Sequence, residues 1–269
     1  MINAVELFPV ERRDRILGLL QEEGKVVALD LARRLNVSID TVRRDLDYLA
    51  SAGSIRRVHG GALPAAPVPG FIQQRSAEET EAKKALAQRG ASLVRAGSVV
   101  LFDSGSSNLE IVKALPRGIE FTAVTPCLPI AVALTDLPEV EVVVLGGRLH
   151  RRESMTVGLR AVKELEDFRA DLCFLGVCAL HADVGISTFS VEELEMKQAF
   201  VRCAGEVVGI LTASKFNKAA PFVVGSIGIL THAIVEGGVG ASELDLLRRY
   251  GVFVERRQTK WGAIPSLGT

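Results

Sequence analysis

The sequence predicts an α/β protein in two parts, an N-terminal winged helix-turn-helix and a C-terminal α/β domain with a largely parallel sheet. The stretch 64–70 holds three prolines and a glycine, which no helix or central strand tolerates, so we expect a linker there. Before it, apolar residues recur at helical spacing. After it, β-branched apolar runs alternate with helical patterns, as in a parallel sheet covered on both faces. The predicted domains are 8–63 and 71–255, with a tail over 256–269.

Composition excludes several classes of protein. The 269 residues carry 32 Lys and Arg against 32 Asp and Glu, so bulk positive charge does not hold nucleic acid. Aromatic residues make up 5% of the chain, which argues against a binder that stacks single-stranded bases. No apolar run reaches the roughly 18 residues that span a bilayer, and residues 1–6 do not begin a signal peptide, so we expect a cytoplasmic protein.

The four cysteines show neither C-x-x-C spacing nor nearby histidines at metal-ligand spacing. We expect reduced, buried thiols, with no metal and no cofactor. They are Cys127, Cys173, Cys178 and Cys203.

The N-terminal part predicts three helices followed by a short hairpin. A two-residue turn, Asn36-Val37, separates the second helix from a third that Ser38 is suited to cap. Such a close pair of helices with a terminal hairpin is a winged helix-turn-helix, with the helix-turn-helix at about 26–45. The predicted helices cover 10–23, 28–35 and 38–52, and the strands cover 55–58 and 62–63.

The larger part begins with a predicted helix over 77–94, where Ser76 and Glu79 have the spacing of a capping box. Strands and helices then alternate to the end of the domain. The predicted strands cover 98–102, 121–125, 140–145, 172–177, 207–212 and 233–235. The predicted helices cover 107–114, 128–134, 162–167, 191–204 and 242–250.

The third helix has a distinct outward face. At 100° per residue, Leu46 and Leu49 fall within about 40° of Val42, while Arg44 points away from that core direction. An outward arginine near the start of this helix is placed to meet base edges in the major groove, and the hairpin suits phosphates or a minor groove. The predicted DNA contacts are Ser38, Asp40, Thr41, Arg43 and Arg44 on the helix and Arg56, Arg57 and His59 in the hairpin.

A solvated helix explains the same pattern. Asp40 precedes Arg44 by four residues and Asp47 follows it by three, so both acids have the spacing of intrahelical ion pairs. Residues 33–61 hold six arginines against three aspartates, which favours DNA. The three acids, which include Asp45, are expected to select among DNA contacts. A module that binds protein instead of DNA also fits the zero net charge.

Residues 103–107 predict an anion site. Asp103 and the serines after it follow a buried strand and open a helix, where unpaired N–H groups and the helix dipole favour an anion. In a parallel sheet, ligands bind at the carboxyl ends of the strands. The end of the strand predicted over 140–145 adds a glycine pair and an arginine, and the end of the strand predicted over 207–212 adds a lysine. The predicted effector-binding set is Asp103, Ser104, Gly105, Ser106, Ser107, Gly146, Gly147, Arg148 and Lys215. Each also has a plainer explanation, as a tight turn, a packing glycine or a surface charge.

Several segments resemble DeoR-type bacterial transcriptional regulators. The stretch Val37–Leu49, continuing from Gly53 to Ala62, is similar to the family's DNA-binding signature, and Leu101–Ser107, Val144–Gly147 and Ser214–Phe216 are similar to its sensor blocks. The resemblance implies a homo-oligomeric repressor, dimer or tetramer, of sugar-catabolism genes. It also implies relief by a phosphorylated sugar or related metabolite, and a sensor domain similar in fold to ribose-5-phosphate isomerase.

That fold raises the alternative of a sugar-phosphate isomerase with an appended DNA module. No carboxylate lies between Leu172 and His181, where such an enzyme has a strongly acidic strand end, so a proton-shuttling pair is not evident. We expect no enzyme and no catalytic residues, with Asp103 orienting sugar hydroxyls. Cys178, flanked by apolar residues, is expected to be a buried thiol and not a nucleophile.

The sequence departs from the family pattern at positions expected on the pocket edge. Three further residues keep the pattern but equally fit a solvated helical face with i,i+4 pairing. The departures are Pro126, Phe189, Ser190 and Thr212, and the three retained residues are Glu192, Glu193 and Lys197.

Overall fold

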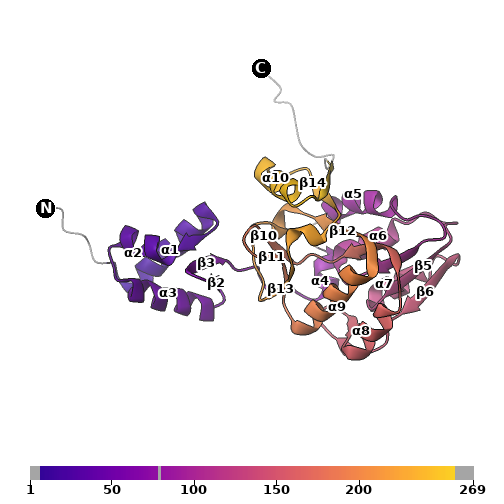
Figure 1. The fold of residues 1–269 in the computed structure, drawn as a ribbon, viewed down its shortest axis with the longest axis horizontal. Coiled ribbons are helices and arrows are strands. Elements are labelled where there is room, and N and C mark those ends of the chain that lie inside the picture. Colours follow the sequence, from indigo (N-terminus) through magenta and orange to yellow (C-terminus); the bar gives the residue numbers. More distant parts are fainter. Residues whose placement is uncertain (1–6, 78–79, 258–269) are drawn as a thin grey trace, which may run out of the picture.

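The computed structural model describes residues 7–77 and 80–257. Two domains are joined by a single stretch of chain (Figure 1). The predicted α/β class, with a winged helix-turn-helix in front of a largely parallel sheet, is confirmed.

The N-terminal domain packs three helices against a small antiparallel sheet of order β1-β3-β2. Val42, Leu46 and Leu49 are all buried, as the helical spacing predicts. A Cβ atom on Gly61 would lie 2.0 Å from the Val26 carbonyl oxygen, so β1 and β3 approach this closely only because that position is glycine. The elements are α1 (Pro9–Glu23), β1 (Val26–Val27), α2 (Ala28–Leu35), α3 (Ile39–Ser51), β2 (Ile55–Val58) and β3 (Gly61–Pro64).

The C-terminal domain is built on a seven-stranded sheet in which every neighbouring pair is parallel. One apolar core lies between the sheet and helices α5, α6 and α7, and the other lies beneath α8, α9 and α10. The strands are β4 (Val99–Phe102), β5 (Phe121–Thr125), β6 (Val140–Val144), β9 (Ala170–Leu175), β12 (Ala204–Leu211), β14 (His232–Glu236) and β15 (Phe253–Arg257). The helices are α4 (Ile72–Ala77), α5 (Thr80–Ala91), α6 (Ser106–Lys113), α7 (Leu128–Leu134), α8 (Leu159–Glu166), α9 (Val191–Cys203) and α10 (Ala241–Arg249).

The strand order, β15-β14-β12-β9-β4-β5-β6, reverses direction between β4 and β9. From β4 the chain builds outward through β5 to β6, then returns to the other side of β4 to add β9, β12, β14 and β15. In open parallel sheets such a switch point leaves a crevice at the carboxyl ends of the two diverging strands. The residues that follow β4 and β9 are therefore placed to form a site.

Some elements differ from the sequence prediction. Helix α5 lies within the helix predicted over 77–94, whereas α4 begins at Ile72, before the predicted start. Ser76 lies inside α4, where its hydroxyl donates to the Ile72 carbonyl at 2.8 Å, so it does not cap the following helix. Glu79 lies outside the described residues. Strand β15 also extends through Arg257, two residues into the expected tail.

The sequence did not predict β1 or β15. It also did not predict five short strands of three or four residues each, which are too short for an alternating pattern to identify. They form a hairpin of β7 (Arg148–His150) with β8 (Met155–Val157), and a small antiparallel sheet of β10 (Ala179–His181), β11 (Gly185–Thr188) and β13 (Phe222–Gly225).

The proline-rich segment lies against the C-terminal domain. Pro64 ends β3, and the Ala66 N–H donates to the Ala219 carbonyl at 3.0 Å while the Ala219 N–H donates to the Pro64 carbonyl at 3.3 Å. Ala66 is buried in a small cluster with Ala179 and Ala220. The start of the predicted linker is thus fixed to the domain that follows it.

Among the helices of residues 7–77 and 80–257, none combines the length and apolar character that crossing a membrane requires.

Candidate functional site

The outward face of α3 carries an unpaired arginine. Arg44 is exposed and forms no hydrogen bond or ion pair with any described residue. Asp40 pairs instead with Arg43, three residues along, at 3.0 Å. Ser38 caps the helix by accepting from the Thr41 N–H at 3.1 Å. The i,i+4 pair that argued for a merely solvated helix is therefore not formed, and Arg44 remains available to a partner.

Asp45 does not belong to this face, contrary to the sequence expectation. Its carboxylate is buried and accepts from Arg12 Nε at 2.5 Å and Arg13 Nε at 3.1 Å, while the Arg13 guanidinium lies 3.7 Å from the centroid of the Tyr48 ring. Asp45 therefore fixes α1 against α3. The helical arithmetic contained this signal, since Asp45 lies about 60° from Val42.

The wing arginines have partners in this structure. Arg57 Nε lies 3.3 Å from Asp47 Oδ1, which ties the wing to α3. Arg56 reaches the C-terminal domain and donates to the Pro221 carbonyl at 2.9 Å. His59, at the hairpin turn, is exposed.

A cavity lies at the switch point of the sheet, which we call the switch-point cavity. It is lined by the turn after β4, by residues 175–178 at the end of β9, by the end of β12 and by residues from α4 and the β7–β8 turn. Its volume is about 20 Å³. The lining residues are Arg75, Ser104, Gly105, Ser106, Ser107, Asn108, Glu153, Leu175, Gly176, Val177, Cys178, Lys197, Ile210 and Lys215.

The serine turn 104–107 lines the cavity with donors. Gly105 has φ +147° where it precedes α6, a backbone conformation that favours glycine, and the first N–H groups of α6 follow it. Within residues 7–77 and 80–257, the hydroxyls of Ser104, Ser106 and Ser107 and the Lys215 ammonium have no hydrogen-bond partner. These are the predicted effector residues that the structure brings together.

Asp103 lies beneath the cavity, not in its lining. It is fully buried and accepts from the Ser104 N–H at 2.7 Å, the Gly176 N–H at 2.9 Å and Lys197 Nζ at 2.5 Å. With both oxygens hydrogen-bonded to the protein, the carboxylate organises the turn. That Asp103 orients sugar hydroxyls stays a prediction. Asp103 also forms an ion pair with Lys197, so it is not a free acid-base group of the kind that the isomerase alternative requires.

Lys197 is buried, so it is not part of a solvated face. Its ammonium also donates to the Gly176 carbonyl at 2.7 Å. Although burial alone lowers the pKa of Lys197, the Asp103 carboxylate more than offsets that effect and raises it. A Cβ on Gly176 would lie 2.3 Å from the Ser104 carbonyl oxygen, so the two strand ends meet only because this position is glycine.

Sequence reasoning missed the acidic side of this region. Glu153 lines the cavity and pairs with Arg75, and its second carboxylate oxygen, Oε1, is buried without a partner among the described residues. Burial raises the pKa of Glu153, opposed by Arg75. Glu193, whose pattern equally fitted a solvated face, is buried and accepts from the Thr188 hydroxyl. Glu193 and Lys197 are four residues apart in α9, and their sequence signals were that spacing and the retained family pattern.

Residues 146–148 do not reach the cavity. The strand that precedes them, β6, is at the edge of the sheet, two positions from β4. The Gly146 N–H donates to Glu164 Oε2 at 2.9 Å, and Arg148 pairs with Glu192 at 2.8 Å on the surface. Gly147 has φ +149°, and a Cβ there would lie 2.7 Å from the Val157 carbonyl oxygen. The structure therefore places these three residues in packing and surface pairing.

The four departures from the family pattern also lie outside the cavity lining. The Ser190 hydroxyl accepts from the Glu193 N–H at 3.1 Å and so caps α9, and Phe189 packs against the cluster that holds Ala66. The Thr212 hydroxyl lies 2.8 Å from that of Ser214, and the Pro126 carbonyl accepts from the Thr156 N–H at 2.9 Å. Because none of the four departures lines the cavity, they do not change the residues that a ligand in the cavity would contact.

All four cysteines are unpaired thiols. Burial raises the pKa of Cys127 to about 12, and it also raises the pKa of Cys178, which lines the cavity. These thiols stay protonated near neutral pH and are poor nucleophiles. The described residues contain no cluster of three metal-ligating side chains.

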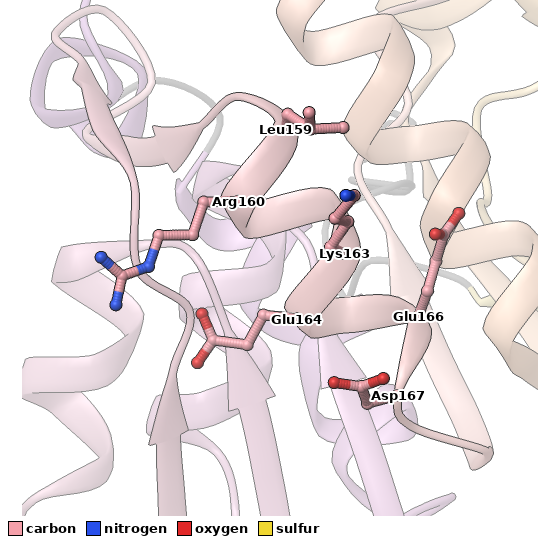
Figure 2. Close-up of a pocket in the computed structure, with 6 residues that line it drawn as sticks. All are labelled: Leu159, Arg160, Lys163, Glu164, Glu166 and Asp167. Atoms are coloured by element: carbon pink, nitrogen blue, oxygen red, sulfur yellow. The ribbon is translucent and has the colours of Figure 1, made fainter.

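A larger surface depression, about 750 Å³, lies along α8 and shares no lining residue with the switch-point cavity. Figure 2 shows that its side chains come from this one helix and its end and do not converge on a point. Binding sites bring polar groups from several elements together, so we do not assign this groove a ligand. It is lined by Leu159, Arg160, Lys163, Glu164, Glu166 and Asp167.

A winged helix-turn-helix with an unpaired outward arginine, joined to an α/β domain with a cavity at its switch point, defines a DNA-binding regulator with a sensor domain. The chain belongs to the DeoR family of transcriptional regulators, because residues 12–66 match the DeoR-like helix-turn-helix domain and residues 78–237 match the DeoR C terminal sensor domain. It is thus a regulator and not an enzyme.

Sequence similarity to known regulators extends over most of the chain. The HTH-type transcriptional regulator GlpR of Haloferax volcanii is 32% identical over 92% of this chain and 98% of its own length. The glycerol-3-phosphate regulon repressor of Escherichia coli strain K12 is 28% identical over 91% of this chain and 98% of its own. Among solved structures, ribose 5-phosphate isomerase A from Methanocaldococcus jannaschii is 14% identical, with a TM-score of 0.38, over 52% of this chain and 55% of its own.

Proposed function

We propose that this regulator represses sugar-catabolism genes and that a phosphorylated sugar, bound in the switch-point cavity, relieves the repression. The observation that carries the proposal is the serine turn 104–107 at the start of α6, which faces the same cavity as Lys215. Helix N-termini with hydroxyl donors and a nearby cation suit a phosphate group. The E. coli relative, whose name assigns it to the glycerol-3-phosphate regulon, supports this chemical class.

The DNA side of the proposal centres on Arg44. It is the unpaired cation of the outward face of α3, so it is the residue best placed to read a base edge in the major groove. Ser38, Thr41 and the Asp40–Arg43 pair flank it, at the end of the helix that enters the groove. His59 and Arg57 in the wing would contact phosphates, with Arg57 first leaving Asp47. Arg56 would first have to leave the Pro221 carbonyl.

We propose that the protein acts as a homo-oligomer, a dimer or tetramer. One recognition helix reads only a few base pairs, and helix-turn-helix proteins gain specificity by placing two of them on repeated half-sites about one helical turn apart. In an oligomer, the effector can also act by changing the distance between the two recognition helices.

A binding titration tests the DNA side of this proposal. Arg44→Ala is expected to weaken binding to the DNA upstream of the protein's own gene by about 1–3 kcal/mol, because a base contact is lost. Gel-shift titration at fixed salt measures the change. Arg117→Ala is the matched control, since Arg117 is an exposed arginine of the sensor domain. Equal affinities for the two variants would contradict the assignment of Arg44.

A further inference from the structure

The switch-point cavity is closed in this structure. Its volume of about 20 Å³ has room for about one water molecule. Pockets that bind small molecules typically have volumes of about 300–1,000 Å³. A sugar phosphate therefore enters only if some of the lining residues move.

Three cations line the cavity, and they are held very differently. Lys197 is fixed by a buried carboxylate and a backbone carbonyl, which accept from two of its three N–H donors. Lys215 has no partner among the described residues. Arg75 pairs with Glu153 and donates from Nε to the Gly70 carbonyl at 3.1 Å. The Arg75–Glu153 pair joins α4 to the β7–β8 turn across the lining, so its separation would open the cavity.

Glu153 is poorly satisfied as a buried anion. Only 3% of the residue is exposed, and one of its two carboxylate oxygens has no partner among the described residues. A buried carboxylate with an unsatisfied oxygen retains part of its desolvation penalty even when the other oxygen is paired. An anion whose oxygens are all hydrogen-bonded in the cavity can therefore replace Glu153 as the partner of Arg75.

We propose that Glu153 is a built-in competitor for the effector: a phosphate monoester bound at the serine turn 104–107 displaces Glu153 from Arg75 and takes this arginine as a ligand. The inference rests on the proposed function, because it assumes that a phosphate group occupies this cavity. It adds that the closed cavity is held shut by the protein's own anion.

The displaced pair lies next to the linker. The Ile72 N–H at the start of α4 donates to the Arg152 carbonyl at 3.0 Å, beside Glu153, and Gly70 accepts from Arg75. The other end of the linker is bonded to Ala219, four residues beyond Lys215. Both ends of the linker are thus attached to segments that carry cavity cations. Because the effector binds the open cavity more tightly than the closed one, its binding changes the linker contacts that hold the DNA-binding domain.

Titration calorimetry on the full chain, with inorganic phosphate as the probe, tests this competition. Glu153→Gln removes the competing charge with little change in shape, and it is expected to tighten phosphate binding about tenfold. Arg75→Gln is expected to weaken binding about tenfold, and in that background Glu153→Gln should have little further effect, because the two residues act through one contact. Glu166→Gln is the matched control: it removes an acid from a surface pair with Arg202, outside the cavity.

The sign of the Glu153→Gln effect decides the proposal, since loss of a merely structural ion pair would weaken binding. Unchanged or weaker phosphate binding by folded Glu153→Gln overturns it. If Lys215→Gln still weakens phosphate binding in that case, the proposed phosphate site survives without the competitor. If neither the wild type nor Glu153→Gln binds phosphate, the proposed site fails as well. Should Glu153→Gln not fold, Glu153→Asp, which shortens the side chain, is expected to tighten binding by a smaller factor.

Discussion

The two domains use their charged residues in opposite ways. On α3 the Asp40–Arg43 pair is exposed and Arg44 is left without a partner, so the charges are ready for a molecule outside the protein. In the sensor domain, Asp103 and Lys197 are almost completely buried and satisfy one another. The comparison shows that α3 keeps a charge available to a partner outside the protein, whereas the buried pair is satisfied within the domain whose turn it organises.

The largest expected effect breaks the buried pair. Asp103→Ala leaves the Lys197 ammonium buried without its carboxylate, so the sensor domain should lose about 3–5 kcal/mol of unfolding free energy. Asp40→Ala removes an exposed pair and should cost about 0–1 kcal/mol. Urea unfolding of both variants, followed by circular dichroism, measures the difference. Similar losses in the two variants would remove the contrast between the domains.

A smaller effect concerns the pH dependence that Glu153 adds to stability. Burial raises the pKa of Glu153, opposed by Arg75 and Lys197 and reinforced by Glu193. The folded protein therefore binds this proton more tightly than the unfolded chain, and the contribution of Glu153 to stability is lost as the pH rises from its ordinary range through the raised pKa.

Glu153→Gln is accordingly expected to gain stability relative to the wild type as the pH increases from 4.5 to 7.5. Thermal unfolding of both proteins over that range measures the difference in Tm, with Glu166→Gln as the exposed control. A difference that is constant with pH would show that Glu153 does not titrate in a buried site.

The N-terminal domain was largely predictable because its signals are local. Helical spacing alone identified the core positions Val42, Leu46 and Leu49, and it set Arg44 on the opposite face. The same arithmetic places Asp45 toward the core, so its position and not its charge predicts its role. A carboxylate that faces the core requires a buried partner, and for Asp45 that partner is Arg12.

The cavity was only partly predictable because its residues meet through strand order. The serine turn 104–107 follows a recognisable strand, whereas Arg75 and Glu153 are 78 residues apart and lie in a short helix and a turn without periodic pattern. Residues 146–148 follow a strand just as Asp103 does, yet β6 lies at the edge of the sheet. A list of strand ends cannot distinguish these cases, because the position of the switch point depends on how the strands pair.

The central claim is that the sensor cavity controls the DNA-reading surface, and one binding measurement tests it most directly. Fluorescence anisotropy on the upstream DNA, with a panel of sugar phosphates and their unphosphorylated parents, compares the wild type with Lys215→Gln and with the control Lys113→Gln, an exposed lysine on α6. The account predicts that a sugar phosphate, and not its parent sugar, weakens DNA binding by the wild type and by Lys113→Gln, and that Lys215→Gln responds far less. An equal response by Lys215→Gln, or no response of the wild type to any phosphate, would contradict it.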